Sequence, residues 1–393
     1  AGGKPLEYED ALFRLFLEPD GTAWAHSVNQ VVAFTAVQKS IGLLRNYHYE
    51  APRQWNNRVV GFAEDDRQQL WFGGGDGFNC LDLTTGNIRS HKPLEGATDR
   101  LAHGSVRGIG WDGRYVVLGP TDKGVWLFDP RTERYHRPVY ASDSARIAVE
   151  RDFIDHLLVL RNKDIIVCGR FHVYRIKAPD YRLDFLDFPG ERTNSNVAYE
   201  DAQGRLWVGT HAGLYGIDPS GQSFYQQKMP TVISIWQDDQ NTFLIGTSEG
   251  LRRIRADQPQ NPAEMIDSPA EGVGVTVVFR DSLGRAWLGT LDGLFLADPP
   301  LTVFRKFDFA DNLQSPVFHG CSYLRLSSGM VVMGGINGLN YFFPEKIPLE
   351  DRPLSVSIAR VRINDGDSVL YAPSQPFELG FRYNTLTVEL AAP

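Results

Sequence analysis

The sequence of 393 residues lacks several features that mark large classes of proteins. It has no apolar run of 18 or more residues, so no segment has the pattern of a membrane-spanning helix. No stretch is strongly basic and the formal net charge is −8, which argues against a nucleic-acid partner. Only three cysteines occur, Cys80, Cys168 and Cys321, and no two have the spacing of a metal site. We expect each to be a buried, small apolar residue.

Motifs of common enzymes are also missing. The sequence contains neither a G-x-S-x-G nucleophile elbow nor a Walker A loop. The glycine-rich segment 73–77 falls at a turn between two predicted strands and not before a helix, so we do not interpret it as a phosphate loop. We expect no catalytic centre, no metal and no cofactor in this chain.

Glycine, proline and aromatic residues are plentiful. The chain has 38 glycines, 23 prolines and 12% aromatic residues, which is typical of many short strands joined by tight turns. Apolar residues make up 42%, enough for a large core. No long segment shows the periodicity of a helix. The composition therefore predicts an all-β protein.

An internal repeat is the strongest signal in the sequence. Its clearest copies, residues 200–219 and 281–299, share the pattern D-x-x-G-R-x-W-h-G-T-x-x-G-L-h-x-h-D-P, in which h is apolar. Weaker copies surround five further glycines, and neighbouring anchors lie 37 to 50 residues apart. The anchoring residues are Gly73, Gly119, Gly169, Gly209, Gly246, Gly289 and Gly334.

Each copy predicts four antiparallel strands. Asp-x-x-Gly is a tight turn, the Trp strand packs between sheets, and Asp-Pro ends the next strand. Four strands in roughly 40–45 residues make one propeller blade. Seven anchors and a degenerate copy at residues 19–24 predict a single β-propeller of seven or eight four-stranded blades. The last copy lacks a fourth strand, which we expect residues 5–8 to supply, closing the ring.

The repeat stops after Ile347. We predict a propeller domain over residues 1–347, followed by a partial β-sandwich segment over residues 354–393. Strands are expected in this tail at residues 354–358, 360–363, 376–379 and 384–390. About 40 residues are marginal as an independent sandwich. The tail therefore has the pattern of the first part of a longer domain.

The repeat resembles the two-component regulator propeller repeat. The match is best at residues 201–219 and 281–299, and residues 332–347 are similar to the terminal repeat of that family. The tail, through residues 384–388, is similar to the opening of the triple-tyrosine domain that follows such propellers. The resemblance covers nearly the whole chain.

The resemblance implies a function. Members of the family are periplasmic sensor regions of bacterial two-component proteins tethered to the inner membrane, often sensing an oligosaccharide. A small-molecule or oligosaccharide ligand would bind at one end of the propeller, and a cytoplasmic output domain, such as a histidine kinase, would receive the signal. A homodimer is implied in signalling. Two features differ: many members have two successive propellers, and the tyrosine-rich half of the sandwich is absent here.

Polar and ionisable residues fall on the loops that gather at one end of a propeller channel. Their identities vary between copies while the scaffold residues repeat, as expected of a binding site on a regular frame. Arginines among them suit a carboxylate or sulfate on an acidic glycan. The candidate ligand-binding residues are Asn56, Arg58, Asp76, His103, Arg107, His156, Arg170, Asn196, His211, His319 and Asn337.

Other functions remain open from the residues alone. A propeller-type polysaccharide lyase or hydrolase would need a histidine as base and an arginine beside a uronate carboxylate, and His211 with Arg170, or His103 with Arg107, would suit. A protein-interaction scaffold would need no small ligand. Metal binding by the loop histidines is a further alternative.

Overall fold

The computed structural model describes residues 40–45, 57–75, 77–91, 105–121, 123–187 and 194–349, and the backbone of six further strands outside these ranges. Residues 40–349 form one compact unit, and residues 1–39 together with 350–393 are grouped in another. The first unit carries the repeats and is described first.

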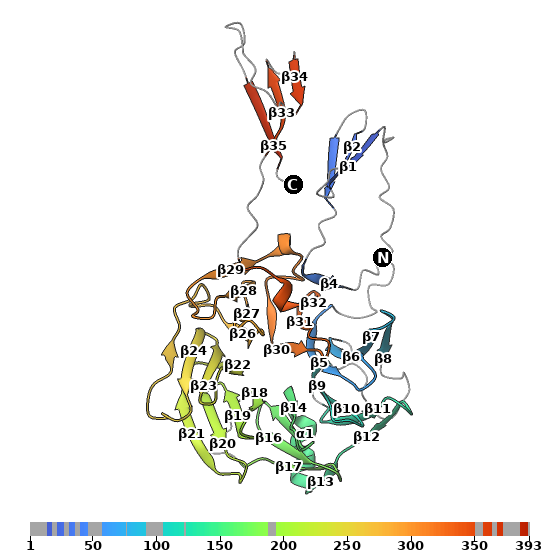
Figure 1. Cartoon of the computed structure of the whole chain (residues 1–393). Coiled ribbons are helices and arrows are strands. Elements are labelled where there is room, and N and C mark those ends of the chain that lie inside the picture. Colours follow the sequence, from blue (N-terminus) through green and yellow to red (C-terminus); the bar gives the residue numbers. More distant parts are fainter. Residues whose placement is uncertain are drawn as a thin grey trace. The chain divides into compact units, whose positions relative to one another are not determined.

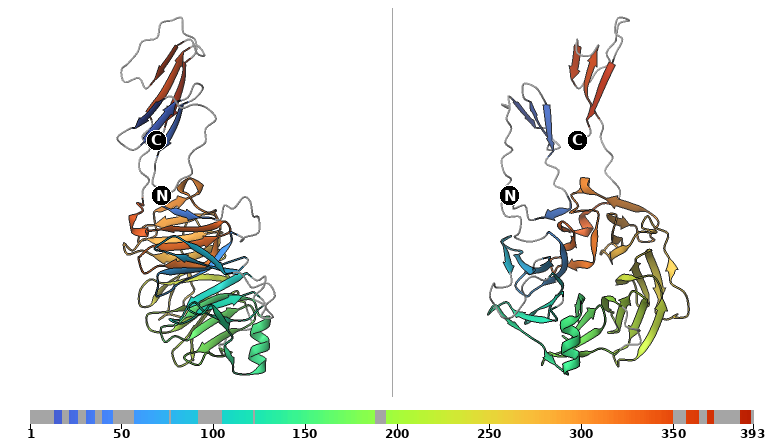
Figure 2. Two further views of the ribbon diagram at one scale, coloured as in Figure 1. Left: turned by 90° about the vertical axis from the view of Figure 1, so that its right-hand side faces the viewer. Right: turned by 180° about the vertical axis from the view of Figure 1, so that it is seen from behind.

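Residues 40–349 form a β-propeller of seven blades, numbered here in chain order (Figure 1). Figure 2 shows the same unit from the side and from behind. The first three blades contain β5 (Val59–Glu64), β6 (Gln69–Gly74), β7 (Gly77–Asp82) and β8 (Ile88–His91); β9 (Val106–Trp111), β10 (Val116–Pro120), β11 (Trp126–Asp129) and β12 (Arg134–His136); and β13 (Val139–Tyr140), β14 (Ile154–Val159), β15 (Ile165–Gly169), β16 (Val173–Lys177) and β17 (Arg182–Phe185).

The remaining blades follow the same meander. They contain β18 (Ser195–Glu200), β19 (Leu206–Thr210), β20 (Gly213–Ile217) and β21 (Ser223–Lys228); β22 (Val232–Gln237), β23 (Thr242–Thr247), β24 (Gly250–Arg255) and β25 (Glu264–Met265); β26 (Val275–Arg280), β27 (Ala286–Thr290), β28 (Leu294–Ala297) and β29 (Phe304–Phe307); and β30 (Phe318–Arg325), β31 (Val331–Gly335), β32 (Gly338–Phe342) and β4 (Gly42–Leu44). Two short 3-10 helices, η1 (Phe309–Asp311) and η2 (Pro344–Lys346), flank blade 7 in the sequence.

The ring closes through β4, which pairs antiparallel with β32. An N-terminal strand was predicted to complete the last blade, but at residues 5–8, which lie outside the described residues. Asn340 fastens the closure because its side-chain amide donates to the backbone oxygens of Gly42 and Asn312, and its Oδ1 accepts from the backbone of Gln314. The compact unit that contains the propeller spans residues 40–349, and the domain bounds of 1–347 stay a prediction.

No eighth blade is formed by the degenerate copy at residues 19–24. Its tryptophan lies in β2 (Thr22–His26), the middle strand of a three-stranded sheet with β1 (Arg14–Leu17) and β3 (Val31–Thr35). This sheet belongs to the second unit. A Gly-Thr-x-Trp sequence without the downstream Gly-Leu strand does not specify a blade.

The repeated aspartate does more than begin a turn. In blade 4, Oδ1 of Asp201 accepts the backbone N–H of Gln203 and Arg205, and Oδ2 accepts Arg205 Nε at 2.6 Å and Trp207 Nε1 at 2.9 Å. Gly204 takes φ of 76°, as the turn requires. Asp, Arg and Trp therefore recur together because one carboxylate holds the turn, the guanidinium and the indole in place.

The repeated tryptophans fill the spaces between blades, as predicted. Trp207 and Trp287 are fully buried. The ring of Trp207 lies 4.6 Å, centroid to centroid, from Phe243 of blade 5, and that of Trp287 lies 4.9 Å from Phe342 of blade 7. Such pairs add to the burial of large apolar area. Aromatic contacts thus join blade 4 to blade 5 and blade 6 to blade 7.

Blade 3 contains a helix that the sequence did not predict, α1 (Asp143–Arg151). Ser142 caps it by accepting the backbone N–H of Ala145 through its hydroxyl. Ala145 and Val149 are buried in the apolar cluster shared by blades 2 and 3. The insertion accounts for the 50-residue interval between Gly119 and Gly169. The helix is too short for its periodicity to stand out among strands.

The C-terminal segment forms a three-stranded sheet of β33 (Ser357–Ile363), β34 (Ser368–Tyr371) and β35 (Leu386–Ala391), with β33 in the centre. Strands were expected at the positions of β33 and β35 but not at β34, and residues 376–379 lie outside the described residues. The assignment of this tail to a triple-tyrosine domain stays a prediction. Within the described part of the chain, no helix has the length and apolar character needed to cross a membrane.

Candidate ligand-binding site

The innermost strand of every blade carries an irregularity opposite its anchoring glycine. Six blades have one extra residue there, and in blade 7 four residues, 319–322, face Gly334. Such bulges re-aim side chains and are frequent beside functional sites. In blades 1 to 6 the extra residues are Val60, Arg107, Asp155, Asn196, Ile233 and Thr276. These residues occupy equivalent positions around the channel, and two of them are charged.

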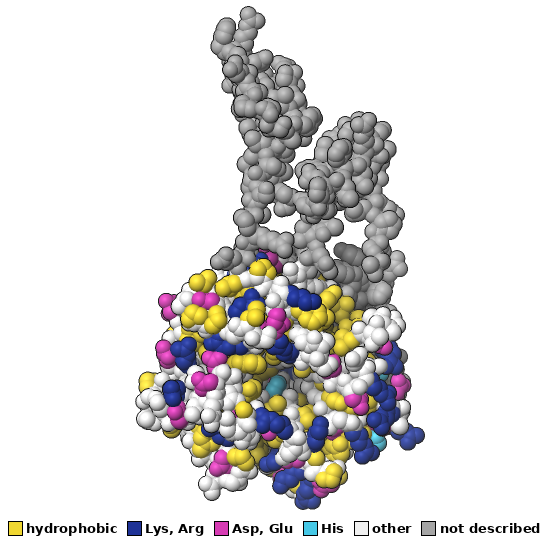
Figure 3. All heavy atoms as spheres, in the orientation of Figure 1, with side chains coloured by type: hydrophobic (Ala, Val, Ile, Leu, Met, Phe, Trp, Pro, Cys, Tyr) yellow, Lys and Arg dark blue, Asp and Glu magenta, His cyan; other side chains and the backbone are white. Residues whose placement is uncertain are grey.

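Charged side chains from blades 1, 2 and 3, and a histidine from blade 7, meet at one end of the channel. Arg107 Nε lies 3.1 Å from Asp155 Oδ1, so the two side chains form an ion pair. The geometry of this contact does not meet that of a hydrogen bond. Arg58, just before β5, donates from Nε to His319 Nε2 at 3.1 Å. Burial and the nearby Arg107 lower the pKa of Arg58. Figure 3 shows a hollow at the centre of one face of the propeller, with a histidine inside it.

A phenylalanine organises two of the arginines. The guanidinium of Arg170 lies over the ring of Phe153 at 4.5 Å and that of Arg107 at 5.7 Å. The buried Asp152 carboxylate accepts the backbone N–H groups of Phe153 and Phe171 and so fixes the turn that bears Arg170. Cations over aromatic faces are favourable and keep their hydrogen-bond donors available at the ring edge. Arg107 and Arg170 thus have a common support.

The cluster has excess positive charge. Three arginines, Arg58, Arg107 and Arg170, lie around the carboxylate of Asp155, and the buried carboxylate of Asp152 adds a second negative charge nearby. Burial raises the pKa of Asp155, although Arg107 and Arg170 partly oppose this. Burial and the charges of Arg58 and Arg107 lower the pKa of His319 to about 4, so its ring is neutral at pH 7 and accepts the hydrogen bond from Arg58. The net charge of these groups favours an anion.

Other predicted residues lie nearby or have structural partners. His211 is exposed, sits 3.0 Å from Asn194 through Nε2, and is close enough to lower the pKa of Asp155. Asn196 donates to the backbone oxygen of Val232 and joins blades 4 and 5. His211 and Asn196 thus lie near the charged end of the channel, which we call the mouth. The side-chain amide of Asn196 is already engaged in its hydrogen bond to Val232.

Asn337 is held in the network that surrounds the closing strand. Its Oδ1 accepts from Asn57, its backbone oxygen accepts from Arg45, and its backbone N–H donates to Gln314. Asn56, Asp76 and His103 lie outside the described residues, so their placement relative to the cluster is not described. Sequence reasoning missed Asp155, although it stands at the bulge position of Arg107 and Asn196 and an alignment of the inner strands would have found it.

Cys321 lies in the channel, at the border of two cavities. Its backbone has φ of 57°, and its Sγ lies 3.1 Å from the oxygen of Ile233 and 3.6 Å from that of Asn196. Burial raises the pKa of its thiol to about 12, so the thiol stays protonated. One cavity, of about 50 Å³, is bordered by Arg107 and Asp155, and the other has a volume of about 230 Å³. Cys321 borders both.

His156 also borders both cavities. Its Nδ1 accepts the backbone N–H of Ala198 at 3.2 Å, which makes the ring neutral with the hydrogen on Nε2. Burial lowers its pKa to about 4. His156 therefore belongs to the wall between the two cavities and not to the charged mouth alone.

Replacing His156 by asparagine is expected to make the stability less sensitive to acid. Between pH 6.5 and pH 4 the unfolded chain binds a proton at His156 that the folded chain does not, so stability falls as the pH falls through this window. Asparagine does not titrate and can still accept from Ala198. Thermal melts from pH 7.5 to 4.5 should show a shallower decline for His156→Asn; an unchanged slope would contradict the assignment.

No group of three or more His, Cys, Asp or Glu side chains in the described part of the chain is placed to hold a metal ion. The site is instead a set of cationic donors around the carboxylate of Asp155.

One family model matches the chain: the two component regulator propeller, over residues 190–212. The matched segment contains the Asp-x-x-Gly-Arg-x-Trp part of blade 4, in which Asp201 holds the turn. A comparison with curated proteins gives no significant match.

Solved structures with the same fold include extracellular domains of hybrid two component systems from B. thetaiotaomicron. One, BT3049, is described as the extracellular domain of a hybrid two component system; it is 17% identical, with a TM-score of 0.72, and the match covers 99% of this chain and 51% of that one. A second, BT4673, is 15% identical with a TM-score of 0.60, over 81% of this chain and 41% of that one. The chain thus spans about half the length of these proteins or less.

The fold also occurs in an enzyme. Virginiamycin B lyase from Staphylococcus aureus, in a catalytically inactive form with quinupristin, is 11% identical with a TM-score of 0.58, over 77% of this chain and 98% of that one. At this identity the likeness concerns the fold alone. Residues 40–349 are therefore a seven-bladed β-propeller in which residues 190–212 match the two component regulator propeller repeat, and the chain shares its fold with extracellular domains of two component system proteins.

Proposed function

We propose that this propeller is the extracytoplasmic ligand-binding region of a bacterial two-component signalling protein and that it recognises an acidic saccharide at the arginine-lined mouth of its channel. The full-length protein is tethered to the inner membrane, acts as a homodimer and passes the signal to a cytoplasmic output domain such as a histidine kinase. The matched repeat and the fold shared with extracellular sensor domains support this context.

The observation that carries the ligand class is the arginine cluster. Arg58, Arg107 and Arg170 come from different blades, and the two nearby carboxylates, Asp155 and the buried Asp152, are fewer than the three arginines. Guanidinium groups bind carboxylate and sulfate oxygens through paired N–H donors, more strongly than they bind neutral oxygens. Three converging arginines therefore support a ligand with a carboxylate or sulfate group.

Aromatic side chains near the mouth suit the rest of a saccharide. Phe171 is exposed beside Arg170, and Phe153 lies under both guanidinium groups. An exposed ring next to cationic donors provides an apolar surface for the face of a sugar while its acidic group is bound. The signal would then pass through the packing of the rigid propeller against other parts of the protein, since its blades have few ways to change shape.

A calorimetric titration tests this proposal. Glucuronic acid and glucose 6-sulfate should bind to the same site and compete with each other, whereas glucose should bind at least tenfold more weakly. Raising the salt concentration should weaken the binding of the two acids, because their attraction to exposed arginines is screened. Equal affinity for glucose and the acids, or affinity that does not change with salt, would refute the acidic ligand class.

A further inference from the structure

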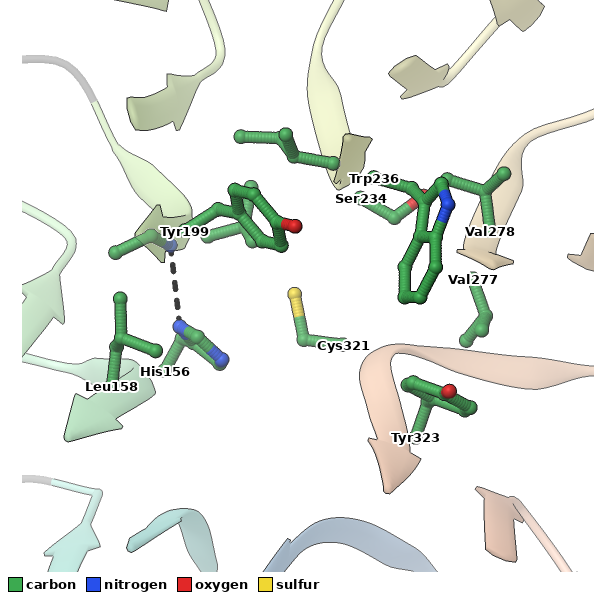
Figure 4. Close-up of a pocket in the computed structure, with 12 residues that line it drawn as sticks. His156, Leu158, Tyr199, Ser234, Trp236, Val277, Val278, Cys321 and Tyr323 are labelled. Atoms are coloured by element: carbon green, nitrogen blue, oxygen red, sulfur yellow. Dashed lines mark hydrogen bonds between the residues drawn. The ribbon is translucent and has the colours of Figure 1, made fainter. Parts of the chain in front are cut away.

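The larger cavity is lined by residues of the inner strands, and it shares His156, Cys321 and Tyr323 with the smaller cavity that Arg107 and Asp155 border. Its volume is about 230 Å³. Blades 3 to 7 contribute its wall, and Figure 4 shows the side chains that point into it. The lining residues include Leu158, Tyr199, Trp236, Val277, Val278 and Tyr323.

Three aromatic rings face the space from different blades. Tyr199 of β18, Trp236 of β22 and Tyr323 of β30 surround the Sγ of Cys321 in Figure 4. Tyr323 is fixed by stacking on Phe279 with ring centroids 4.4 Å apart. Rings that are already immobile lose little entropy when a ligand packs against them. The cavity is therefore a preformed aromatic pocket.

No lining residue of this cavity carries a charge at neutral pH. The lining includes no Asp, Glu, Lys or Arg, and the single histidine, His156, is neutral because burial lowers its pKa to about 4. Because Nδ1 of His156 accepts from the backbone of Ala198, the hydrogen is on Nε2, and that nitrogen is free to donate towards the cavity. The pocket thus offers an apolar wall and one well-defined donor.

We propose that this cavity is a second binding site, separate from the arginine mouth, for a neutral aromatic molecule of one or two rings with one hydrogen-bond acceptor. A cavity of about 150 Å³ lined by apolar residues is known to hold benzene, so 230 Å³ accommodates a second ring. A sugar fits the chemistry less well, because most of its hydroxyls would face Leu158, Val277 and Val278 and lose hydrogen bonds to water.

Calorimetric titration of the whole chain with 2-naphthol tests this site. The parent protein should bind 2-naphthol in a saturable way, and Leu158→Trp, which fills the cavity from a partly exposed position, should weaken binding at least tenfold. The matched control is Leu283→Trp, at a side chain that is 57% exposed elsewhere on the surface. His156→Leu should lower the affinity for 2-naphthol by about 3- to 10-fold and leave the affinity for naphthalene unchanged. Only 2-naphthol has an oxygen that can accept a hydrogen bond from Nε2.

Thermal melts of the variants show whether each is folded before it is titrated. Absence of saturable 2-naphthol binding by the folded parent, unchanged affinity in folded Leu158→Trp, or displacement of 2-naphthol by glucose would each overturn the proposal. Glucuronic acid titrated into the same variants separates the two sites: Leu158→Trp should bind it as the parent does, and the double variant Arg107→Ala/Arg170→Ala should bind 2-naphthol as the parent does.

Discussion

Replacing Asp281 by alanine is expected to lower the free energy of unfolding by about 3–5 kcal/mol, the usual cost of removing one partner of a buried ion pair. Both oxygens of Asp281 are in use: one accepts the backbone N–H of Leu283 and Arg285, and the other accepts Arg285 Nε at 2.9 Å and Trp287 Nε1 at 3.0 Å. The substitution would leave a buried guanidinium and a buried indole N–H without their acceptor.

Arg285 extends the effect beyond its own blade. It is 8% exposed and also donates to the backbone oxygens of Pro344 and Ile347, beyond the last strand of blade 7. Loss of Asp281 would therefore loosen the contact of blade 6 with this segment. For a unit of this size, a loss of about 3–5 kcal/mol in the free energy of unfolding corresponds to a fall in Tm of about 5–8 °C.

Differential scanning calorimetry measures this change, with Asp257→Ala as the matched control. Asp257 pairs with Arg255 at 2.9 Å, but both side chains are largely exposed, and such pairs contribute little. The control should melt with the parent. If Asp281→Ala melted within 1–2 °C of the parent, as surface substitutions do, the view of the repeated aspartate as the centre of each blade would be wrong.

Removing the two arginines that flank Phe153 should abolish recognition of the acidic ligand. Charge-assisted hydrogen bonds contribute about 1.5–3 kcal/mol each, so Arg107→Ala alone should lower the affinity for glucuronic acid by roughly 10- to 150-fold. In the double variant Arg107→Ala/Arg170→Ala, binding of glucuronic acid should fall below detection. The site depends on converging charge, and Asp155 would then lie beside only one arginine, Arg58. Calorimetric titration gives the affinities.

A second variant tests the same site because it is expected to raise the affinity for the acidic ligand. Asp155→Asn removes the carboxylate that pairs with Arg107, so the affinity for glucose 6-sulfate should rise several-fold. Arg131→Ala, at an exposed arginine in blade 2, is the matched control and should leave the affinity unchanged. Weaker binding in Asp155→Asn, or equal loss in Arg131→Ala, would mean that the arginine cluster does not hold the acid.

The blade architecture was predictable because each repeat contains the residues that determine its own turns, strands and packing. Gly204 marks a turn that needs positive φ, and Trp207 marks the space between neighbouring sheets, so the pattern defines strands and their packing at once. The closing strand was placed at residues 5–8 and instead is β4, because a three-residue apolar strand carries no repeat signature. The helix α1 was missed since it interrupts a blade without changing its other strands.

The site was less predictable because it depends on register. Arg107 and Arg170 could be assigned to one end of the channel from their loop positions, but whether a side chain at the inner strand faces the channel depends on a bulge, which the sequence does not reveal. Asp155 was missed because its side-chain direction follows from the bulge, although aligning the inner strands would have placed it at the position of Arg107 and Asn196. Polar residues on loops also satisfy the backbone, as Asn196 and Asn337 do, and composition alone does not distinguish these from ligand contacts.

The central claim is that an acidic saccharide binds at the arginine-lined mouth of the channel. A crystal structure of the chain soaked with glucuronic acid tests this most directly. The account predicts the carboxylate of the sugar within hydrogen-bond distance of the guanidinium groups of Arg107 and Arg170. Sugar bound on the outer strands, or in the aromatic cavity, would contradict it.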